Sequence, residues 1–204
     1  MSYCGWDRNK EQQNYHNKIW GRPVHSDSQH FEFLLFEVLQ CGLSWWLVYG
    51  KRNIVSECFN HFDYYSVSRF DDSDVERIIN TKGMIKSEKK IRAIIHNAKL
   101  FIEIIKEYGS FDKYLWKYTN NKSVVYDKHP EGFIPVSNGL SKKISDDLFN
   151  RGFKYTGPIV IYSHLQACGI ILDHDKNCPC FNEIISKYPT IYKKRNREVG
   201  VKKY

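Results

Sequence analysis

Two pairs of metal-binding residue types lie at opposite ends of this chain, and they restrict how it can fold. Cys4 and His16 stand near the start, whereas His174 and Cys178 stand near the finish. Two thiols and two imidazoles are enough to fill a tetrahedral zinc site. If the four residues bind one ion, the N-terminal arm lies against the C-terminal segment. The closed ligand shell then leaves no position for a catalytic water, so the site is structural.

The choice of ligands at the C-terminal end is open in the sequence. His174 and Cys178 have a spacing that one helical turn satisfies. Cys180 could replace Cys178, although Pro179 between them makes ligation by both awkward. Each residue taken alone is more simply a free thiol or a surface histidine, and the presence of a pair at both ends favours zinc.

The composition is that of a globular protein. Hydrophobic residues make up 42% and aromatic residues 15% of 204 residues, which predicts one domain or two closely packed lobes. No run of about 18 apolar residues is present to span a membrane, and the N-terminal segment lacks the apolar stretch of a secretion signal. We therefore expect a cytoplasmic protein without a membrane partner. Its six cysteines should be mostly reduced, which favours metal binding over disulfides.

The net charge of +8 suggests a nucleic-acid partner, but it is unevenly distributed. From Lys187 onward there are seven Lys and Arg residues against Glu198 alone, so this segment holds six of the eight net charges. A basic tail is most often a solvated extension. Charge alone therefore does not establish DNA binding.

Helical periodicity runs through almost the whole chain, and no strand pattern of convincing length is found, so the expected fold is all-α. Asp27 opens a helix that is apolar nearly all round and should be buried. Ser87 precedes a long amphipathic helix that Gly109 ends. Residues 73–76 are typical of a capping box. Residues 119–138, rich in Asn, Pro and Gly, are expected to form a loop.

Glu37 is the most unusual residue of the apolar helix. A buried carboxylate must be neutralised, hydrogen-bonded or open to a cavity, so Glu37 either reaches solvent or a lysine, or lines a binding pocket. The same two readings apply to Glu32 on another face. Several aromatic residues elsewhere could stack on a planar base beside such a carboxylate, although tryptophan is most often a core residue, as we expect for Trp20. These residues are Trp6, Tyr15, Trp20, Trp45 and Trp46.

A glycine-rich turn between two predicted helices is the candidate phosphate site. It runs from Gly152 to Gly157, with Pro158 placed as the first residue of the next helix and Lys154 nearby. Such a turn presents backbone N–H groups and a helix N-terminus to an anion. Helix–Gly–helix turns are common, so this signal is weak by itself.

Taken together, these motifs resemble the DNA-3-methyladenine glycosylase I family, among the helix-hairpin-helix DNA glycosylases. The resemblance covers residues 1 to about 180. Its motifs are Cys4-Gly-Trp6, Tyr15-His16, Trp20-Gly21, Glu37, Cys41-Gly-Leu-Ser-Trp45, Arg151-Gly-Phe-Lys-Tyr-Thr-Gly157-Pro158, Gln166-Ala-Cys-Gly169 and Asp173-His174.

The resemblance implies a fold and a set of roles. One glycosylase domain of two packed helical lobes spans 1–182, with the hairpin near 152–158, and 183–204 form a basic extension. One zinc ion would link the N-terminal and C-terminal segments of the chain. The resemblance implies that zinc is bound by Cys4, His16, His174 and Cys178. It implies that the base is bound by Trp6, Tyr15, Glu37 and Trp45, and that Glu37 is also the catalytic residue. It implies that DNA is bound by Gly42, Leu43, Ser44, Gly152, Lys154 and Gly157.

The implied activity is hydrolysis of the N-glycosidic bond of 3-methyladenine in alkylated double-stranded DNA by a monomeric, monofunctional enzyme. Free 3-methyladenine and an abasic site would be the products, and whether 3-methylguanine is a minor substrate is open. The alternative is a zinc-stabilised, non-catalytic binder of damaged DNA. A lyase acting through a Schiff base is a further formal alternative. One departure from the family pattern is Lys86-Ser87-Glu88, where Glu88 would repel a phosphate.

Overall fold

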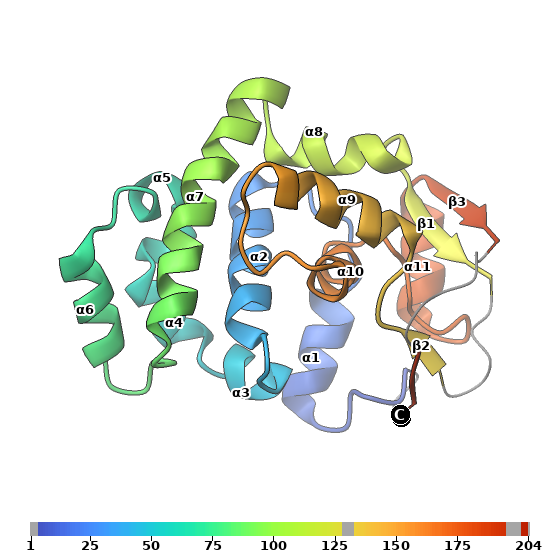
Figure 1. The fold of residues 1–204 in the computed structure, drawn as a ribbon. Coiled ribbons are helices and arrows are strands. Elements are labelled where there is room, and N and C mark those ends of the chain that lie inside the picture. Colours follow the sequence, from blue (N-terminus) through green and yellow to red (C-terminus); the bar gives the residue numbers. More distant parts are fainter. Residues whose placement is uncertain (1–3, 128–132, 195–200, 204) are drawn as a thin grey trace.

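The computed structural model describes residues 4–127, 133–194 and 201–203, and it confirms the predicted helical fold (Figure 1). No helix in this part of the chain is long and apolar enough to cross a membrane. The α-helices are α1 Lys10–Lys18, α2 Asp27–Gln40, α3 Trp45–Tyr49, α4 Arg52–Cys58, α5 Tyr64–Val67, α6 Asp72–Asn80, α7 Glu88–Tyr108, α8 Phe111–Trp116, α9 Gly139–Asn150, α10 Pro158–Ala167 and α11 Pro179–Lys187. Short 3-10 turns cover Asn60–Phe62 and Lys117–Thr119.

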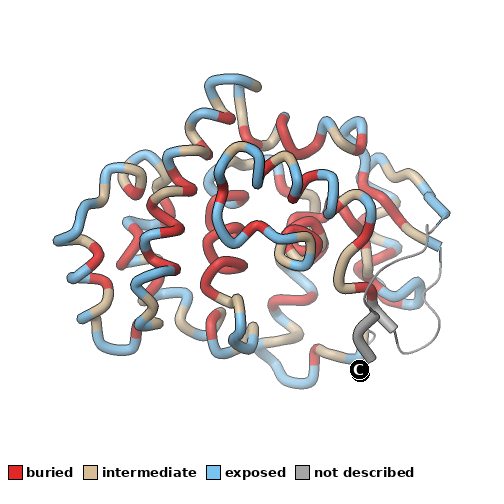
Figure 2. The backbone as a smooth tube through the Cα atoms, in the orientation of Figure 1, coloured by how far each residue is buried: buried red, intermediate tan, exposed pale blue. Residues whose placement is uncertain are grey.

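Helix α2 lies at the centre of the fold. Its residues 30–39 are all buried, as expected of a helix that is apolar on every side (Figure 2). Helices α7, α8 and α10 pack against it, and α5 and α6 pack on α7. The buried side chain of α7 residue Lys90 donates to the carbonyl oxygens of Leu39 at 2.6 Å and of Cys41 at 2.5 Å. A cation at this end complements the dipole of α2.

The predicted helix ends are mostly confirmed. Helix α7 follows Ser87 and ends at Gly109, whose φ of 84° is in the left-handed region that glycine tolerates best. The capping box was predicted two residues too late. It is formed by Asp71 and Asp74, because the Asp71 carboxylate accepts the backbone N–H of Asp74 and the Asp74 carboxylate accepts that of Asp71.

Strands occur where a loop was predicted, and this part of the prediction was wrong. Strand β1 Ser123–Tyr126 pairs in parallel with β3 Thr190–Lys193, and β2 Phe133–Pro135 pairs antiparallel with β4 Val201–Lys203. Each strand has only three or four residues, which is too short for an alternating pattern to show.

The C-terminal segment joins the body of the protein through β3. The boundary expected after residue 182 lies inside α11, and the β1–β3 pairing ties the segment beyond α11 to residues 123–126. Figure 1 shows α11, β1 and β3 together on the right-hand side of the molecule.

Candidate functional site

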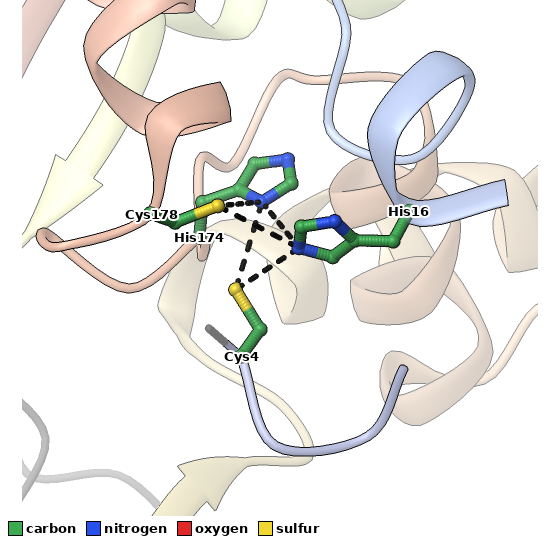
Figure 3. A group of neighbouring side chains, drawn as sticks. All are labelled: Cys4, His16, His174 and Cys178. Carbon is green, nitrogen blue, oxygen red and sulfur yellow. Dashed lines mark hydrogen bonds between the residues drawn. The ribbon is translucent and has the colours of Figure 1, made fainter. Parts of the chain in front are cut away.

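Cys4, His16, His174 and Cys178 form one cluster in the structure (Figure 3). The His16 Nε2 atom lies 3.1 Å from the Cys4 sulfur and 3.1 Å from His174 Nδ1. The Cys178 sulfur lies 3.7 Å from each of these two nitrogens, and the Cys4 sulfur lies 3.7 Å from His174 Nδ1. The predicted juxtaposition of the two chain ends is therefore confirmed.

The distances between these donor atoms fit a tetrahedral metal site. Bonds of about 2.0–2.1 Å to nitrogen and about 2.3 Å to sulfur give tetrahedron edges of roughly 3.3–3.8 Å. The five donor–donor separations, from 3.1 to 3.7 Å, fall close to this range. The four donors thus suit a small, thiophilic cation with no further contraction of the chain.

Hydrogen bonds to the outer nitrogens turn both imidazoles toward the centre. His16 Nδ1 lies 2.7 Å from the Asn17 side-chain oxygen, and His174 Nε2 lies 3.0 Å from the Trp20 carbonyl oxygen. Because these oxygens accept, the protons belong on the outer nitrogens and the inner nitrogens keep their lone pairs. Burial also lowers the pKa of His174 to about 4, which keeps its ring neutral as a metal ligand requires.

The structure selects Cys178 over Cys180. The Cys180 sulfur lies outside the cluster, 3.8 Å from the Asn17 side-chain oxygen. His174 and Cys178 are joined by a turn, closed by a bond from the Cys178 N–H to the Asp175 carbonyl, and not by the helical turn that was predicted. Cys178 is the residue that caps the start of α11.

Gly21 is required beside the cluster. Its φ of +75° is in the left-handed region, and a Cβ atom there would lie 2.7 Å from His174 Nε2. A side chain at this position would push the imidazole off the Trp20 carbonyl. This close approach explains the Trp20-Gly21 pair of the sequence.

The N-terminal arm carries Trp6 from the metal cluster to a group of aromatic rings. The Trp6 ring lies 5.2 Å from the ring of His16 and 6.0 Å from that of Trp46. Tyr15 lies 6.3 Å from Trp6 and 5.6 Å from Trp45. The structure thus brings Trp6, Tyr15 and Trp45 together, and Cys4, in the same arm as Trp6, lies in the Cys/His cluster.

Tyr49 belongs to this aromatic group although sequence reasoning missed it. Its ring lies 4.6 Å from Tyr15 and is stacked on Trp45 at 5.5 Å. Tyr49 follows Trp45 by four residues, so the helical spacing on α3 could have predicted that the two rings share one face. Trp20 packs against the core as expected, and its carbonyl also orients His174.

Glu37 is buried in α2 and has no side-chain hydrogen-bond partner among the residues that the structure describes. Burial raises the pKa of its carboxyl group to about 8. Its charge is close enough to Tyr15 to raise the pKa of that phenol, after burial itself. Glu32, by contrast, is paired with Arg52, whose Nε lies 2.6 Å from the carboxylate. Of the two acidic residues, Glu37 is the one available to a ligand.

The hairpin between α9 and α10 is fixed to α7. The Asn97 side chain accepts the Lys154 N–H and donates to its carbonyl, both at 2.8 Å. Gly152 has a φ of +92°, and its carbonyl oxygen lies 3.0 Å from His96 Nε2. Gly157 caps α10 with open space beside it, so its backbone can approach a ligand. The backbone of Lys154 is thus used within the protein, whereas its side chain is exposed.

Residues 42–44 form an exposed turn between α2 and α3. Gly42 has a φ of +77° with open space around it, and the Leu43 side chain is 38% exposed. The Ser44 hydroxyl caps α3 by accepting the Leu47 N–H. Further along the chain, the Glu88 carboxylate is paired with Arg92 at 2.7 Å, so its charge is locally compensated.

The chain is similar to known glycosylases along most of its length. The family described as Methyladenine glycosylase matches residues 6–182. DNA-3-methyladenine glycosylase 1 of Escherichia coli (strain K12) is 35% identical over 182 residues, which cover 89% of this chain and 97% of that protein. The DNA-3-methyladenine glycosylase of Haemophilus influenzae is 32% identical over 82% of this chain and 90% of its own length.

Solved structures give the same result. The structure of 3-methyladenine DNA glycosylase I from Staphylococcus aureus has a TM-score of 0.83 at 30% identity, with 88% of this chain and 96% of that chain covered. A single-residue variant of 3-methyladenine DNA glycosylase I in complex with 3-methyladenine also has a TM-score of 0.83 at 30% identity, covering 88% and 97% of the two chains.

Proposed function

This chain belongs to the methyladenine glycosylase family, and we propose that it excises 3-methyladenine from alkylated double-stranded DNA. The N-glycosidic bond is hydrolysed, the free base is released and an abasic site is left. The observation that carries the proposal is the buried carboxyl group of Glu37, which acts electrostatically on Tyr15 of the aromatic group.

Recognition of the base combines stacking with one acidic group. A base flipped out of the duplex is held by aromatic faces and by hydrogen bonds to its edge. Trp6 and Tyr15 supply the stacking surfaces, Trp45 walls the site, and Glu37 accepts hydrogen bonds from the exocyclic amine and a ring N–H. Burial without a partner makes the ionised carboxylate unfavourable. A cationic methylated base therefore stabilises this ionised form more than a neutral base does.

The chemical demand on the enzyme is modest. Methylation at N3 makes adenine cationic and a good leaving group, so the glycosidic bond is already weak. Extrusion of a nucleotide costs a few kcal/mol, and less for a damaged base. Glu37 therefore acts as the catalytic residue by holding the departing base and stabilising positive charge on the flipped nucleotide. Water then captures the sugar.

Zinc is the ion that we assign to Cys4, His16, His174 and Cys178. Two thiolates and two imidazoles are a typical structural zinc set, and a closed shell supplies folding energy in place of catalysis. The ligands hold the N-terminal arm so that Trp6 stays over the base site. The ring separation of 5.2 Å between Trp6 and His16 supports this role.

DNA binding is assigned to the hairpin and to the turn at 42–44. Gly157, at the start of α10, offers its backbone to a phosphate, the exposed Lys154 side chain adds charge, and Gly152 shapes the turn. Leu43, exposed between Gly42 and Ser44, enters the gap left by the flipped nucleotide. The enzyme acts as a monomer and does not form a Schiff base.

Incubation of the protein with methylated duplex DNA and chromatography of the released material test this function. We expect free 3-methyladenine and abasic sites, none from unmethylated duplex, and no adduct after borohydride treatment. Binding to methylated DNA without release of any base would instead support the non-catalytic binder. A borohydride-trapped adduct would show a lyase.

A further inference from the structure

A second group of metal-binding side chains lies in the core, away from the terminal cluster. One nitrogen of His30, one nitrogen of His164 and the Cys168 sulfur lie within 4.8 Å of one another. All three residues are buried, with exposed fractions of 0%, 1% and 0%. We propose that these three side chains bind a second, thiophilic metal ion.

The hydrogen bonding of the two imidazoles carries the argument. His30 Nε2 lies 3.3 Å from an Asp112 carboxylate oxygen, so its proton belongs on that nitrogen and Nδ1 keeps a lone pair. His30 Nδ1 and both ring nitrogens of His164 are buried without a partner among the described residues. Buried polar side chains nearly always find a partner, so these orphan nitrogens indicate a missing ligand, and one ion would take His30 Nδ1 and one of the two His164 nitrogens.

The carboxylate behind His30 is a further feature of metal sites. A metal-ligating histidine usually donates its other N–H to a carboxylate or a carbonyl, which fixes the tautomer. Asp112 does this for His30, and it is itself held by His25 at 3.0 Å. The arrangement parallels the terminal cluster, where Asn17 and Trp20 serve the same purpose.

Local structure places the three donors on two packed helices and the cap of one of them. Cys168 is the C-cap residue directly after α10, and its N–H donates to the carbonyl oxygen of His164 at 3.0 Å, which keeps the two residues on one face. His30 lies in the first turn of α2, against which α10 packs. Binding forms a metal–sulfur bond as the Cys168 thiol releases its proton to solvent. The resulting thiolate alone balances the charge of copper(I), and the thiolate and the Asp112 carboxylate together balance that of zinc.

The donor set narrows the choice of ion. Thiolate and imidazole ligands select copper(I) and zinc over the harder magnesium and calcium. Two histidines and one cysteine match a trigonal copper site, whereas zinc prefers a fourth donor. The ion would join α2, which bears Glu37, to α10, which begins at the hairpin. Any effect of this link on the glycosylase rests on the proposed function, whereas the existence of the metal site does not.

Metal counting on the whole protein tests the proposal. Metal-free, reduced protein is titrated with zinc and, without oxygen, with copper(I), each against a chromophoric chelator. We expect two ions per chain for at least one of the two metals, and one ion after Cys168→Ala or His164→Phe. The matched control Cys58→Ala removes a buried cysteine outside both clusters and should keep two ions.

The outcomes separate the possibilities without depending on any glycosylase assay. Asp112→Asn should lower the affinity for the second ion by about 10- to 100-fold, because it removes the carboxylate that accepts the His30 N–H. One ion per wild-type chain with either metal, lost on Cys178→Ala, would overturn the proposal and leave a buried water as the partner of the orphan nitrogens. Two ions in both the wild type and Cys168→Ala would overturn it as well.

Discussion

Glu37→Gln should make the protein more stable relative to the wild type as the pH rises. The Glu37 carboxyl group is buried without a side-chain partner among the described residues, and its pKa is raised to about 8 by that burial. The folded protein therefore keeps a proton on Glu37 at pH values where the unfolded chain, with a pKa near 4.5, has lost it. Glutamine has nearly the same shape and no such titration.

The sign and size follow from this pKa difference. Below about pH 4.5 both states hold the proton, and Glu37 contributes no pH dependence. Between about pH 4.5 and 8 the folded state binds more protons, so its stability falls by up to about 1.4 kcal/mol per pH unit. Above about pH 8 the loss levels off at roughly 3–5 kcal/mol, and Glu37→Gln removes all of this dependence.

The assay is urea unfolding of both proteins from pH 5 to 9, followed by tryptophan fluorescence. The difference between variant and wild-type unfolding free energies should grow across this range and reach a plateau. Other titrating groups cancel because both proteins carry them. Glu32→Gln is the matched control on the same helix, since it breaks the ion pair with Arg52 and should destabilise the protein. A constant difference for Glu37→Gln at all pH values would refute the reasoning.

Three further results are expected. Cys178→Ala should lose the terminal ion and have a lower Tm, whereas Cys180→Ala should keep the ion. Metal analysis and thermal unfolding measure both effects. Loss of the ion in both variants would contradict Cys178 as the fourth ligand. Trp6→Ala should weaken binding of free 3-methyladenine by about 5- to 150-fold because stacking is removed, measured by calorimetry, and unchanged affinity would place the base elsewhere. Lys193 and Lys194 are exposed, and replacing both by Gln should make DNA binding less dependent on salt. The slope of log K against log salt concentration should fall by about one for each phosphate that these lysines neutralise. An identical slope would exclude a role of these two lysines in DNA binding.

Apolar periodicity and the types of a few polar residues made the main helices and the terminal cluster predictable. The apolar pattern located α2 and α7, and Pro158 marked the start of α10. The cluster of Cys4, His16, His174 and Cys178 was predicted from residue types, because two thiols and two imidazoles together are a typical zinc-ligand set. The burial of Glu37 also followed from the apolar residues around it in α2.

Features that depend on distant parts of the chain were not predictable. Strand β1 exists because residues 190–193 pair with it, and a four-residue segment carries no such information. Asp71 and Ser73 are both good N-caps, and only the backbone geometry decides which one begins α6. His30 and His164 are far apart in sequence, so only the packing of α2 against α10 brings them together.

The proposed role of Glu37 is tested most directly by single-turnover release of 3-methyladenine from methylated duplex DNA by the wild type and by Glu37→Gln. A hydrogen bond involving a charged group contributes about 1.5–3 kcal/mol, so the variant should release the base about 10- to 150-fold more slowly than the wild type. Equal rates for the two proteins, or no release by the wild type at high enzyme concentration, would contradict base recognition by Glu37.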